Sequence, residues 1–493
     1  MLRTFTPSDV EWGRTARQAL RRTTGLVCAL LVAVLAWGSS LSVPVEAQAA
    51  DAWAMQGHDS RRTGRTTLEG PERPVIKWVM DLGSTVQDNT GPIVGPDGSI
   101  YIRIGGQLKA INTDGTVRWQ IPSSLPPTCS CAPALSPTGD TIYHPFAEFP
   151  PFPPGGSLVT GIRALATSDG HEHWRLPLPL GGMTYSSHAV GFDGTLYFGT
   201  WGSSKIVAIN PNGTLRWTYD SGSGCAQESP VAVDTNGYVY FEHNCIGLIA
   251  LDQNGVERWR RGGSFTWRTP TIAADGTVYI DGLVSGTLPV RTETIGFRPD
   301  GSVKWRRDSG AAGYFKGFAL SASGSTLFSF EAGKLLALNT ADGASQWSRT
   351  LAPAQQTFTG SPALTANNVL YVMGDYFSPS YTPDSVFAVS AVDGHLVWSM
   401  QFDSELVFWG APSPAIGPGR TLYVVSSGCT TIACSPLRNG KLYAIGESPA
   451  LAGVPVPHGR ALVADPGVVF PGPTHHPGGS LQTPPTVHPG RRQ

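Results

Sequence analysis

Residues 91–119 read GPIVGPDGSIYIRIGGQLKAINTDGTVRW, and the order of features in this stretch recurs along most of the chain. A short apolar segment leads to an Asp-Gly turn, a strand with an aromatic residue, a loop, a strand with alanine near its end, a second Asp-Gly turn and a tryptophan. Residues 187–217 and 229–259 repeat this order. Asp-Gly and Asn-Gly accept the positive φ angles that tight hairpins need. Each repeat therefore predicts four short antiparallel strands.

Two recurring positions give the number of repeats. The tryptophan that closes each repeat is Trp78, Trp119, Trp174, Trp217, Trp259, Trp305, Trp347 and Trp398. The aromatic residue of the second strand is Tyr101, Tyr143, Tyr197, Tyr240, Tyr279, Phe328, Tyr371 and Tyr423. Four antiparallel strands per repeat make a propeller blade, so the chain is predicted to be an all-β, eight-bladed β-propeller. The closing tryptophans are expected to be structural, packed between adjacent blades.

The two ends of the repeat array complete each other. The last copy, Ser413 to Ala444, has three strands but no closing tryptophan, whereas Val75 to Val79 holds Trp78 with no strands before it. An open array would leave strand hydrogen bonds unpaired at its edges. We therefore expect the N-terminal strand to join the last blade and close the ring.

The segments outside the propeller differ from it in composition. Basic residues including Arg21 and Arg22 precede an apolar run from Leu26 to Trp37, and Ala47–Ala50 offers a small-residue cut near Ala49. The run is shorter than the roughly 20 apolar residues of a membrane span. Residues 1–50 are therefore predicted to be an export signal, with a retained anchor as the alternative. Residues 51–446 form the propeller, and the Pro-, Gly- and His-rich residues 447–493 are expected to be a disordered tail.

Composition restricts the classes of partner. Charged residues make up 14% of the chain and the net charge is -1, so no basic field is available to hold a nucleic acid. The pair His171 and His173 shares a strand face, but the slot of His173 before the tryptophan holds Arg or Lys in other repeats. The turn Asp234 to Gly237 lacks the length and terminal Glu of a calcium loop. No metal site is predicted, and we expect a monomer.

The faces of the predicted ring are unequal. In a four-stranded meander, second turns and blade connections lie on one face, which we call the elaborated face, and first and third turns lie on the other, the short-turn face. The long insertions are second turns, at residues 144–160, 281–293, 374–384 and 426–440. Loops on a rigid scaffold often carry function. The elaborated face is therefore the predicted binding surface.

The cysteines support this asymmetry. Removal of the signal leaves an even number, which favours disulfides in an exported chain; they are Cys129, Cys131, Cys225, Cys245, Cys429 and Cys434. All of them fall on the elaborated face. Within one blade, Cys225 is placed to bond with Cys245, and Cys429 with Cys434, whereas a bond between Cys129 and Cys131 would be strained. Spacing alone does not fix the pairing.

The ends of several repeats resemble the PQQ-like propeller family, which includes quinoprotein alcohol dehydrogenases and the outer-membrane assembly lipoprotein BamB. Ala337–Trp347 and Ala388–Trp398 match the length of the family's tryptophan-docking motif, and Ala208–Trp217 is one residue shorter. Residues 53–64 also look like the start of exported bacterial members. The resemblance covers roughly residues 52–446 and implies the fold more strongly than any function, because this fold hosts enzymes, scaffolds and binders.

The first strands are expected to line a central channel, and their alignment places a polar cluster at its mouth on the elaborated face. Blades 4 to 6 contribute Glu228, Arg268 and Lys316 beside Gln227, Trp267 and Phe315, and earlier blades add Tyr185 and Asn89. Arginine and lysine pair with carboxylates and aromatic rings stack, so the cluster is a candidate site for a planar anionic ligand. The alternative is a solvated ion network at a wet entrance.

Three functions remain open at this point. The first is an exported, non-catalytic binding or scaffold protein that engages a protein or extracellular polymer through the elaborated face. The second, implied by the family resemblance, is a PQQ-dependent dehydrogenase, which would need PQQ and calcium. Glu228 alone supplies an acidic ligand at the aligned positions, and Cys129 and Cys131 depart from the adjacent cysteines of such enzymes. The third is a glycan binder using aromatic residues such as Phe408 and Trp409.

Overall fold

The computed structural model describes most of the propeller and none of the predicted signal. The described residues are 52–84, 91–104, 106–123, 132–148, 159–178, 187–200, 204–222, 229–243, 245–263, 269–284, 291–311, 317–331, 333–351, 356–358, 360–376, 385–402, 412–426 and 439–449. Within these ranges there is no helix of the length and apolar character that crossing a bilayer requires. The predicted signal and nearly all of the predicted tail lie outside them.

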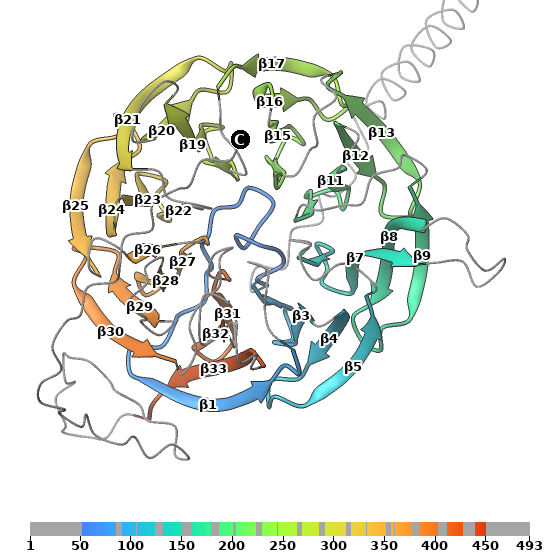
Figure 1. The fold of residues 1–493 in the computed structure, drawn as a ribbon, viewed down its shortest axis with the longest axis horizontal. Helices are drawn as coiled ribbons and strands as arrows, with labels where there is room; N and C mark the ends of the chain where they lie inside the picture. Colours follow the sequence, from blue (N-terminus) through green and yellow to red (C-terminus); the bar gives the residue numbers. More distant parts are fainter. Residues whose placement is uncertain are drawn as a thin grey trace, which may run out of the picture.

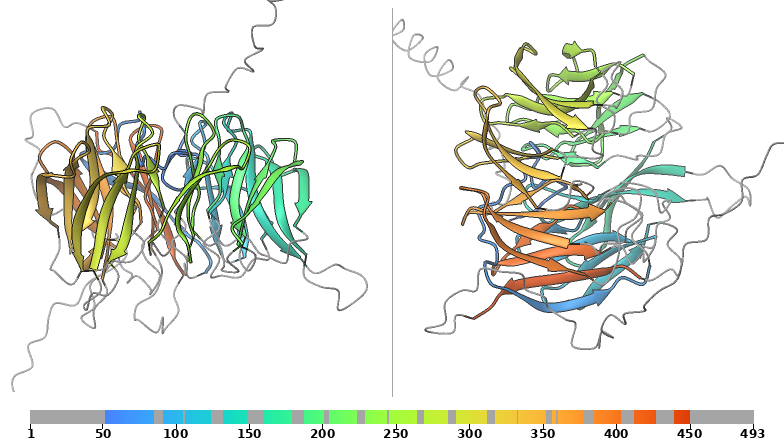
Figure 2. Two further views of the ribbon diagram at one scale, coloured as in Figure 1. Left: turned by 90° about the horizontal axis from the view of Figure 1, so that it is seen from above. Right: turned by 60° about the vertical axis from the view of Figure 1, so that its left-hand side comes forward.

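Eight antiparallel sheets are arranged in a ring, which confirms the predicted eight-bladed propeller (Figure 1). Seven sheets have four strands and one has five. Viewed from the side, the strands of each blade run between the two faces of a flat disc (Figure 2). The innermost strand of a blade is two or three residues long and fully buried, because the blades converge on the axis.

The strands of blades 1 to 4 follow one another from the axis outward. They are β2 (Ile93–Val94), β3 (Ile100–Ile104), β4 (Gln107–Ile111) and β5 (Val117–Pro122); β6 (Ala134–Leu135), β7 (Thr141–Glu148), β8 (Val159–Ala166) and β9 (Glu172–Pro177); β10 (Ala189–Val190), β11 (Leu196–Thr200), β12 (Lys205–Ile209) and β13 (Leu215–Asp220); and β14 (Ala232–Val233), β15 (Val239–His243), β16 (Gly247–Leu251) and β17 (Glu257–Arg261).

Blades 5 to 8 have the same order, except that blade 7 has an added strand, β26, and the outer strand of blade 8 is β1. Their strands are β18 (Thr271–Ile272), β19 (Val278–Val284), β20 (Arg291–Phe297) and β21 (Val303–Ala311); β22 (Ala319–Leu320), β23 (Thr326–Glu331), β24 (Lys334–Asn339) and β25 (Ser345–Thr350); β26 (Gln356–Phe358), β27 (Ala363–Leu364), β28 (Val369–Tyr376), β29 (Ser385–Ser390) and β30 (Leu396–Gln401); and β31 (Ala415–Gly417), β32 (Thr421–Ser426), β33 (Lys441–Glu447) and β1 (Pro74–Asp81). Strand β26 was not predicted; it pairs with the part of β28 that extends beyond β27.

The recurring aromatic residue, a small residue and tryptophan form a row across each blade; the small residue is alanine except in blade 5, where it is Gly296. In blade 1, Tyr101 pairs with Ala110, and Ala110 pairs in turn with Trp119. The rings of Tyr101 and Trp119 meet at a centroid distance of 6.0 Å. The other blades repeat this contact at 5.6 to 6.0 Å. A small residue stands between the two rings because a larger side chain would fill the space in which they pack.

The closing tryptophans also contact the next blade. The indole N–H of Trp217 donates to the carbonyl of Gln253 at 3.0 Å, in the third turn of blade 4. The same type of bond is made by Trp78, Trp119, Trp174, Trp259, Trp305 and Trp398. Gly255 in this turn has φ +77°, and a Cβ on it would lie 2.6 Å from Cδ2 of Trp217. The repeated turn glycine thus serves the hairpin and leaves room for the neighbouring ring.

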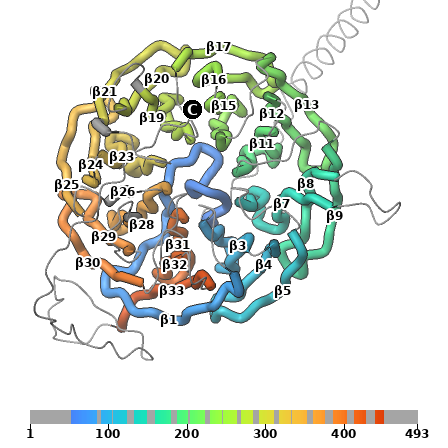
Figure 3. Tube along the Cα trace, viewed as in Figure 1, coloured from blue at the N-terminus to red at the C-terminus, as the bar shows by residue number. Residues whose placement is uncertain are grey.

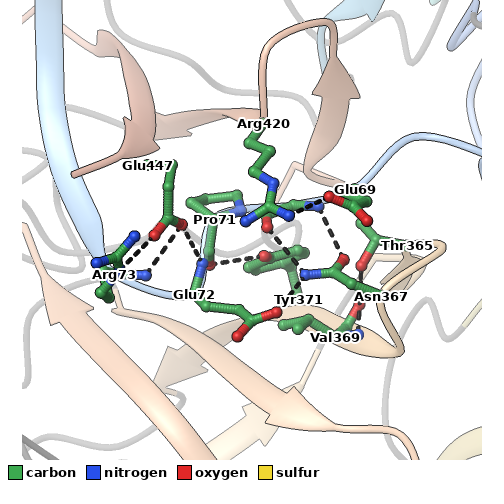
Figure 4. Close-up of polar contacts among 11 residues, drawn as sticks. Glu69, Pro71, Glu72, Arg73, Thr365, Asn367, Val369, Tyr371, Arg420 and Glu447 are labelled. Atoms are coloured by element: carbon green, nitrogen blue, oxygen red, sulfur yellow. Dashed lines mark hydrogen bonds and ion pairs between the residues drawn. The ribbon is translucent and has the colours of Figure 1, made fainter. Parts of the chain in front are cut away.

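The predicted ring closure is confirmed. Strand β1 pairs antiparallel with β33, from Pro74 opposite Glu447 to Asp81 opposite Lys441. Next to this pairing, the Glu447 carboxylate accepts a hydrogen bond from the Glu72 N–H at 2.7 Å and forms an ion pair with Arg73 at 2.7 Å (Figure 4). The first strand of the fold is therefore the outer strand of the last blade.

Candidate functional site

Residues 52–68 run through the centre of the ring before the chain reaches the rim (Figure 3). The second residue of one inner strand after another donates its backbone N–H to a carbonyl of this central segment. These bonds join Val94 to Trp53, Leu135 to Ala54, Val233 to Ser60, Ile272 to Arg61, Leu320 to Thr63 and Leu364 to Gly64, at 2.7 to 3.0 Å. The inner strands would otherwise be sheet edges with unpaired donors. The segment therefore fills the axis at this level, where the sequence predicted a central channel lined by the first strands.

Arg62 fixes the central segment to blades 3 and 4. Its Nε donates to the carbonyl of Val231 at 3.0 Å and its Nη2 to the carbonyl of His188 at 2.8 Å. A further bond from Nη1 reaches the carbonyl of Gln56 within the segment. Burial lowers the pKa of Arg62 to about 10, partly offset by the nearby Asp59 carboxylate. The guanidinium thus stays charged at neutral pH while its donors bind main-chain oxygens at the axis.

The residues that lead into the inner strands form a tight ring beside the central segment. The ring consists of small residues; four of them show how close the strands come. The Ser361 N–H donates to the Ser413 hydroxyl at 2.9 Å. A Cβ on Gly91 would collide with the backbone of Ser413, and one on Gly317 would collide with the Ser361 side chain. Side chains larger than Ser or Thr are therefore excluded where the blades converge.

The predicted ligand-binding cluster at the channel mouth is not tested by this structure. Its members Asn89, Tyr185, Gln227, Glu228, Trp267, Arg268, Phe315 and Lys316 all lie outside the described residues. The internal stretches outside the described ranges are without exception blade connections or second turns. The elaborated face as a binding surface thus stays a prediction.

A layer of buried polar side chains lies next to this face, and the sequence reasoning missed it. Glu242 on β15 accepts a hydrogen bond from the Ser229 hydroxyl at the entrance of the same blade. Asp281 on β19 accepts one from Thr294 at 2.7 Å, and Thr294 in turn contacts Ser309. The signal was available: Glu242 and Asp281 stand two residues after the recurring aromatic, where blades 6 to 8 carry the apolar side chains Phe330, Met373 and Val425.

His144 and Asp281 also correct the predicted insertions. Both were assigned to long second turns, but His144 lies on β7 and Asp281 on β19, and both are buried. The reason is that strand pairing continues further in these blades, as far as Glu148 opposite Val159 and Val284 opposite Arg291.

Two buried histidines stand out electrostatically. Neither ring nitrogen of His144 has a hydrogen-bond partner among the described residues. Burial lowers the pKa of His144 well below its ordinary value, and the cations Arg163 and Arg103 act in the same direction. Burial likewise lowers the pKa of His188 to about 4, although its Nδ1 contacts the carbonyl of Ala132 at 3.2 Å. Both rings are therefore neutral at pH 7.

One of the predicted disulfide cysteines lies in the described part of the chain. Cys245 is disulfide-bonded, and its N–H contacts Nδ1 of His243 at 3.3 Å. The other five, Cys129, Cys131, Cys225, Cys429 and Cys434, lie outside the described ranges. The pairing of Cys225 with Cys245 and of Cys429 with Cys434 stays a prediction. Across the described ranges, no group of three or more His, Cys, Asp or Glu side chains is arranged to hold a metal ion.

Solved structures share the architecture at low sequence identity. The europium-containing methanol dehydrogenase aligns with 82% of this chain and 99% of its own, with a TM-score of 0.56 and 12% identity. BamB from Moraxella catarrhalis aligns over 76% of this chain and 97% of its own, with a TM-score of 0.46 and 15% identity. At 12% identity, the likeness to the methanol dehydrogenase concerns the fold alone.

Comparison with known sequences identifies the family more specifically than the solved structures do. The uncharacterized protein YxaL of Bacillus subtilis (strain 168) is 34% identical over 61 residues, which is 12% of this chain and only 15% of that protein. A family model described as outer membrane protein assembly factor BamB matches residues 159–292 and 291–452. These two stretches make up more than half of the chain and reach from the third strand of blade 2 through the last blade. The protein therefore belongs to the PQQ-like β-propeller family that this BamB model describes.

Proposed function

We propose that this chain is an exported propeller that binds a protein or extracellular polymer without catalysing a reaction. The observation that carries the proposal is the central segment. Residues 52–68 occupy the axis and are hydrogen-bonded to inner strands around the ring. Because the chain itself fills this position, binding falls to the faces of the disc. Of these, the elaborated face has the longer insertions and the cysteines.

Family membership supports the same proposal. The matching family is named for a factor in outer membrane protein assembly, a role that engages other proteins. Export rests on the signal-like residues 1–50. A rigid, closed ring with loops gathered on one face suits a scaffold, since loops on rigid scaffolds provide variable contacts.

Photo-crosslinking from the two faces tests the proposed binding surface. Benzoylphenylalanine is placed at Pro153 in the second turn of blade 2, and in a separate variant at Val392, whose exposed side chain lies in a third turn on the short-turn face. We expect a discrete crosslinked product in the native host only from Pro153. Products from Val392 alone would show that the elaborated face is not the binding surface.

The alternative function, a PQQ-dependent dehydrogenase, is tested separately. The mature protein is titrated with PQQ in the presence of calcium, and in parallel europium, while absorbance and thermal stability are followed. If the protein is a non-catalytic scaffold, neither absorbance nor thermal stability should change saturably up to high micromolar PQQ. A saturable, metal-dependent shift that is lost in Arg268→Ala would overturn that proposal, because Arg268 is the strongest predicted anion ligand at the channel mouth.

A further inference from the structure

A cavity of about 580 Å³ opens on the short-turn face between blades 4 and 5. Its wall includes the first turns of both blades, the third turn of blade 5 and the outer strand of blade 4. The central segment contributes Arg61 to the same wall. The size is that of a small-molecule site. The cavity lies on the face opposite to the one proposed above for partner binding.

Comparison between the repeats shows that blade 4 differs from three other blades in an ion pair beside the cavity. In three other blades, an Asp of the first turn forms an ion pair with the basic residue before the closing tryptophan. These pairs are Asp97 with Arg118 at 3.2 Å, Asp193 with Arg216 at 2.7 Å and Asp275 with Lys304 at 3.6 Å. The pairs link the first turn of a blade to its outer strand.

Blade 4 lacks this pair. Its first turn closes with Asp234 N–H bonded to the carbonyl of Tyr238, the same pattern that joins Gly191 to Thr195 in blade 3. In this register Asn236 occupies the position of the pairing aspartate, and Tyr238 that of a hydroxyl residue. Arg258, which precedes Trp259, has no ion pair or hydrogen bond within the described part of the chain. Its exposed guanidinium lines the cavity instead.

Arg61 brings a second guanidinium to the cavity from the axis. Its main chain is held by the bond from the Ile272 N–H to its carbonyl at 2.9 Å. Its Nε is buried and has no hydrogen-bond partner among the described residues. The rigid main chain thus holds a cation at the inner end of the cavity, while Arg258 supplies one at the outer end.

The acidic residues of the wall are already engaged. The Asp234 carboxylate accepts from the N–H groups of Asn236 and Tyr238 at 2.8 and 2.9 Å. Asp275 accepts from the Thr277 N–H at 2.9 Å and pairs with Lys304, and Asp300 accepts from the Ser302 N–H at 2.8 Å. The carboxylates therefore serve the turns. Arg61 interacts electrostatically with Asp234 and Asp59, but within the described ranges neither guanidinium has a hydrogen-bond acceptor, which leaves their donors for a ligand.

We propose that this cavity binds an organic carboxylate, with Arg61 and Arg258 holding the carboxylate group and Tyr238 beside it. Guanidinium groups match the planar carboxylate with paired hydrogen bonds. A singly charged carboxylate suits the site better than a phosphate, because three aspartates nearby repel a second negative charge. The remaining oxygens of these aspartates favour hydroxyl or ammonium groups on the rest of the ligand. A free amino acid and an acidic sugar both have this chemistry.

Calorimetric titration of the mature protein with glutamate and with glucuronate tests the site and distinguishes these two sources. Glucose and inorganic phosphate serve as the neutral and dianionic comparisons. We expect saturable binding of at least one carboxylate. Arg61→Gln and Arg258→Gln should each weaken it about tenfold or more, the scale of one charge-assisted hydrogen bond. Arg216→Gln, at the equivalent slot of blade 3, should leave the affinity unchanged.

Asn236→Asp gives a variant that can form the ion pair seen in blades 1, 3 and 5. It should abolish binding while the thermal midpoint stays the same or rises, which separates loss of the site from loss of the fold. The proposal is overturned if neither carboxylate binds at millimolar concentration. It is overturned equally if Arg258→Gln and Asn236→Asp bind as the parent does, or if phosphate binds and the carboxylates do not.

Discussion

The guanidinium of Arg62 donates a hydrogen bond of 3.0 Å to the main-chain carbonyl of Val231, which lies 169 residues further along the sequence. This bond ties the start of the described chain to the inner strand of blade 4. Arg62 is 2% exposed, so the carbonyl oxygens that it binds have no access to water that could replace it. The centre of the propeller is therefore held by polar contacts as well as by packing.

Replacing Arg62 by methionine should lower the free energy of unfolding by about 3 kcal/mol or more, because several buried carbonyls lose a charged donor. Urea denaturation measures the change. Arg118→Met, which removes an exposed arginine from the rim, is the matched control and should change stability by less than about 1 kcal/mol. Equal midpoints for the Arg62 variant and the parent would contradict a structural role for the central segment.

Gly255→Ala should be more destabilising than Gly324→Ala. Both glycines have positive φ, +77° and +72°, so both substitutions carry the backbone cost of roughly 1 kcal/mol. A Cβ on Gly324 would meet nothing within 4 Å, whereas one on Gly255 would lie 2.6 Å from the Trp217 ring. Overpacking adds about 1–3 kcal/mol in the second case. Thermal unfolding of the two variants measures the difference, and equal losses would refute the contact between turn and ring.

Tyr371 and Trp398 should be energetically coupled through Pro71. The buried Pro71 carbonyl accepts hydrogen bonds from the Tyr371 hydroxyl and the Trp398 indole, each at 2.8 Å (Figure 4 shows the first). Tyr371→Phe or Trp398→Phe alone leaves one donor in place. The double variant leaves a buried acceptor unpaired and should cost about 1 kcal/mol more than the sum of the single changes. A double-mutant cycle in urea measures this coupling; strict additivity would argue against it.

Stability should fall in mild acid because of the two buried histidines. The folded-state pKa of His188 is lowered from 6.5 to about 4, so below pH 6.5 the unfolded chain binds a proton that the folded chain does not. The stabilisation present above pH 6.5 is therefore lost as the pH falls, by about 3 kcal/mol at pH 4 for His188 alone. His144, with its pKa also lowered, acts in the same direction.

Unfolding free energies measured from pH 7 to pH 4 test this expectation. His188→Asn keeps a donor for the Ala132 carbonyl, and His144→Leu removes a ring that has no hydrogen-bond partner in the described part of the chain. Each should flatten the acid side of the profile. An unchanged slope in both variants would show that other groups cause the acid sensitivity.

The repeat made the fold predictable, because the sequence of each blade carries its own turn and strand signals. The turn dipeptides and the row of Tyr101, Ala110 and Trp119 depend on residues within one repeat length, and the split last blade is recognised as two incomplete copies of the same repeat. Those signals led to the number of blades and to the closure by β1. Strand β26 was missed because its three residues carry no repeat signal.

The central segment was missed for a different reason. Trp53 to Gly64 has neither strand periodicity nor a repeat, and its conformation is set by hydrogen bonds to inner strands far along the chain. Part of the signal for the cavity at blade 4 is in the sequence, because Asn236 stands where blades 1, 3 and 5 carry an aspartate. The cavity also depends on Arg61 of the central segment, whose position the repeats do not predict. The channel-mouth cluster stays a prediction, since all its residues lie outside the described ranges.

The central segment changes how this molecule is expected to unfold. Repeat arrays in which each unit contacts only its neighbours lose their units piecemeal, from the ends or at weak interfaces. Here one stretch of fewer than twenty residues is bonded to inner strands of non-adjacent blades, and its continuation supplies the outer strand of the last blade. Loosening any single blade therefore weakens the anchor of the others. The disc should melt in one cooperative step, and hydrogen exchange of the inner-strand amides should report a single free energy around the ring.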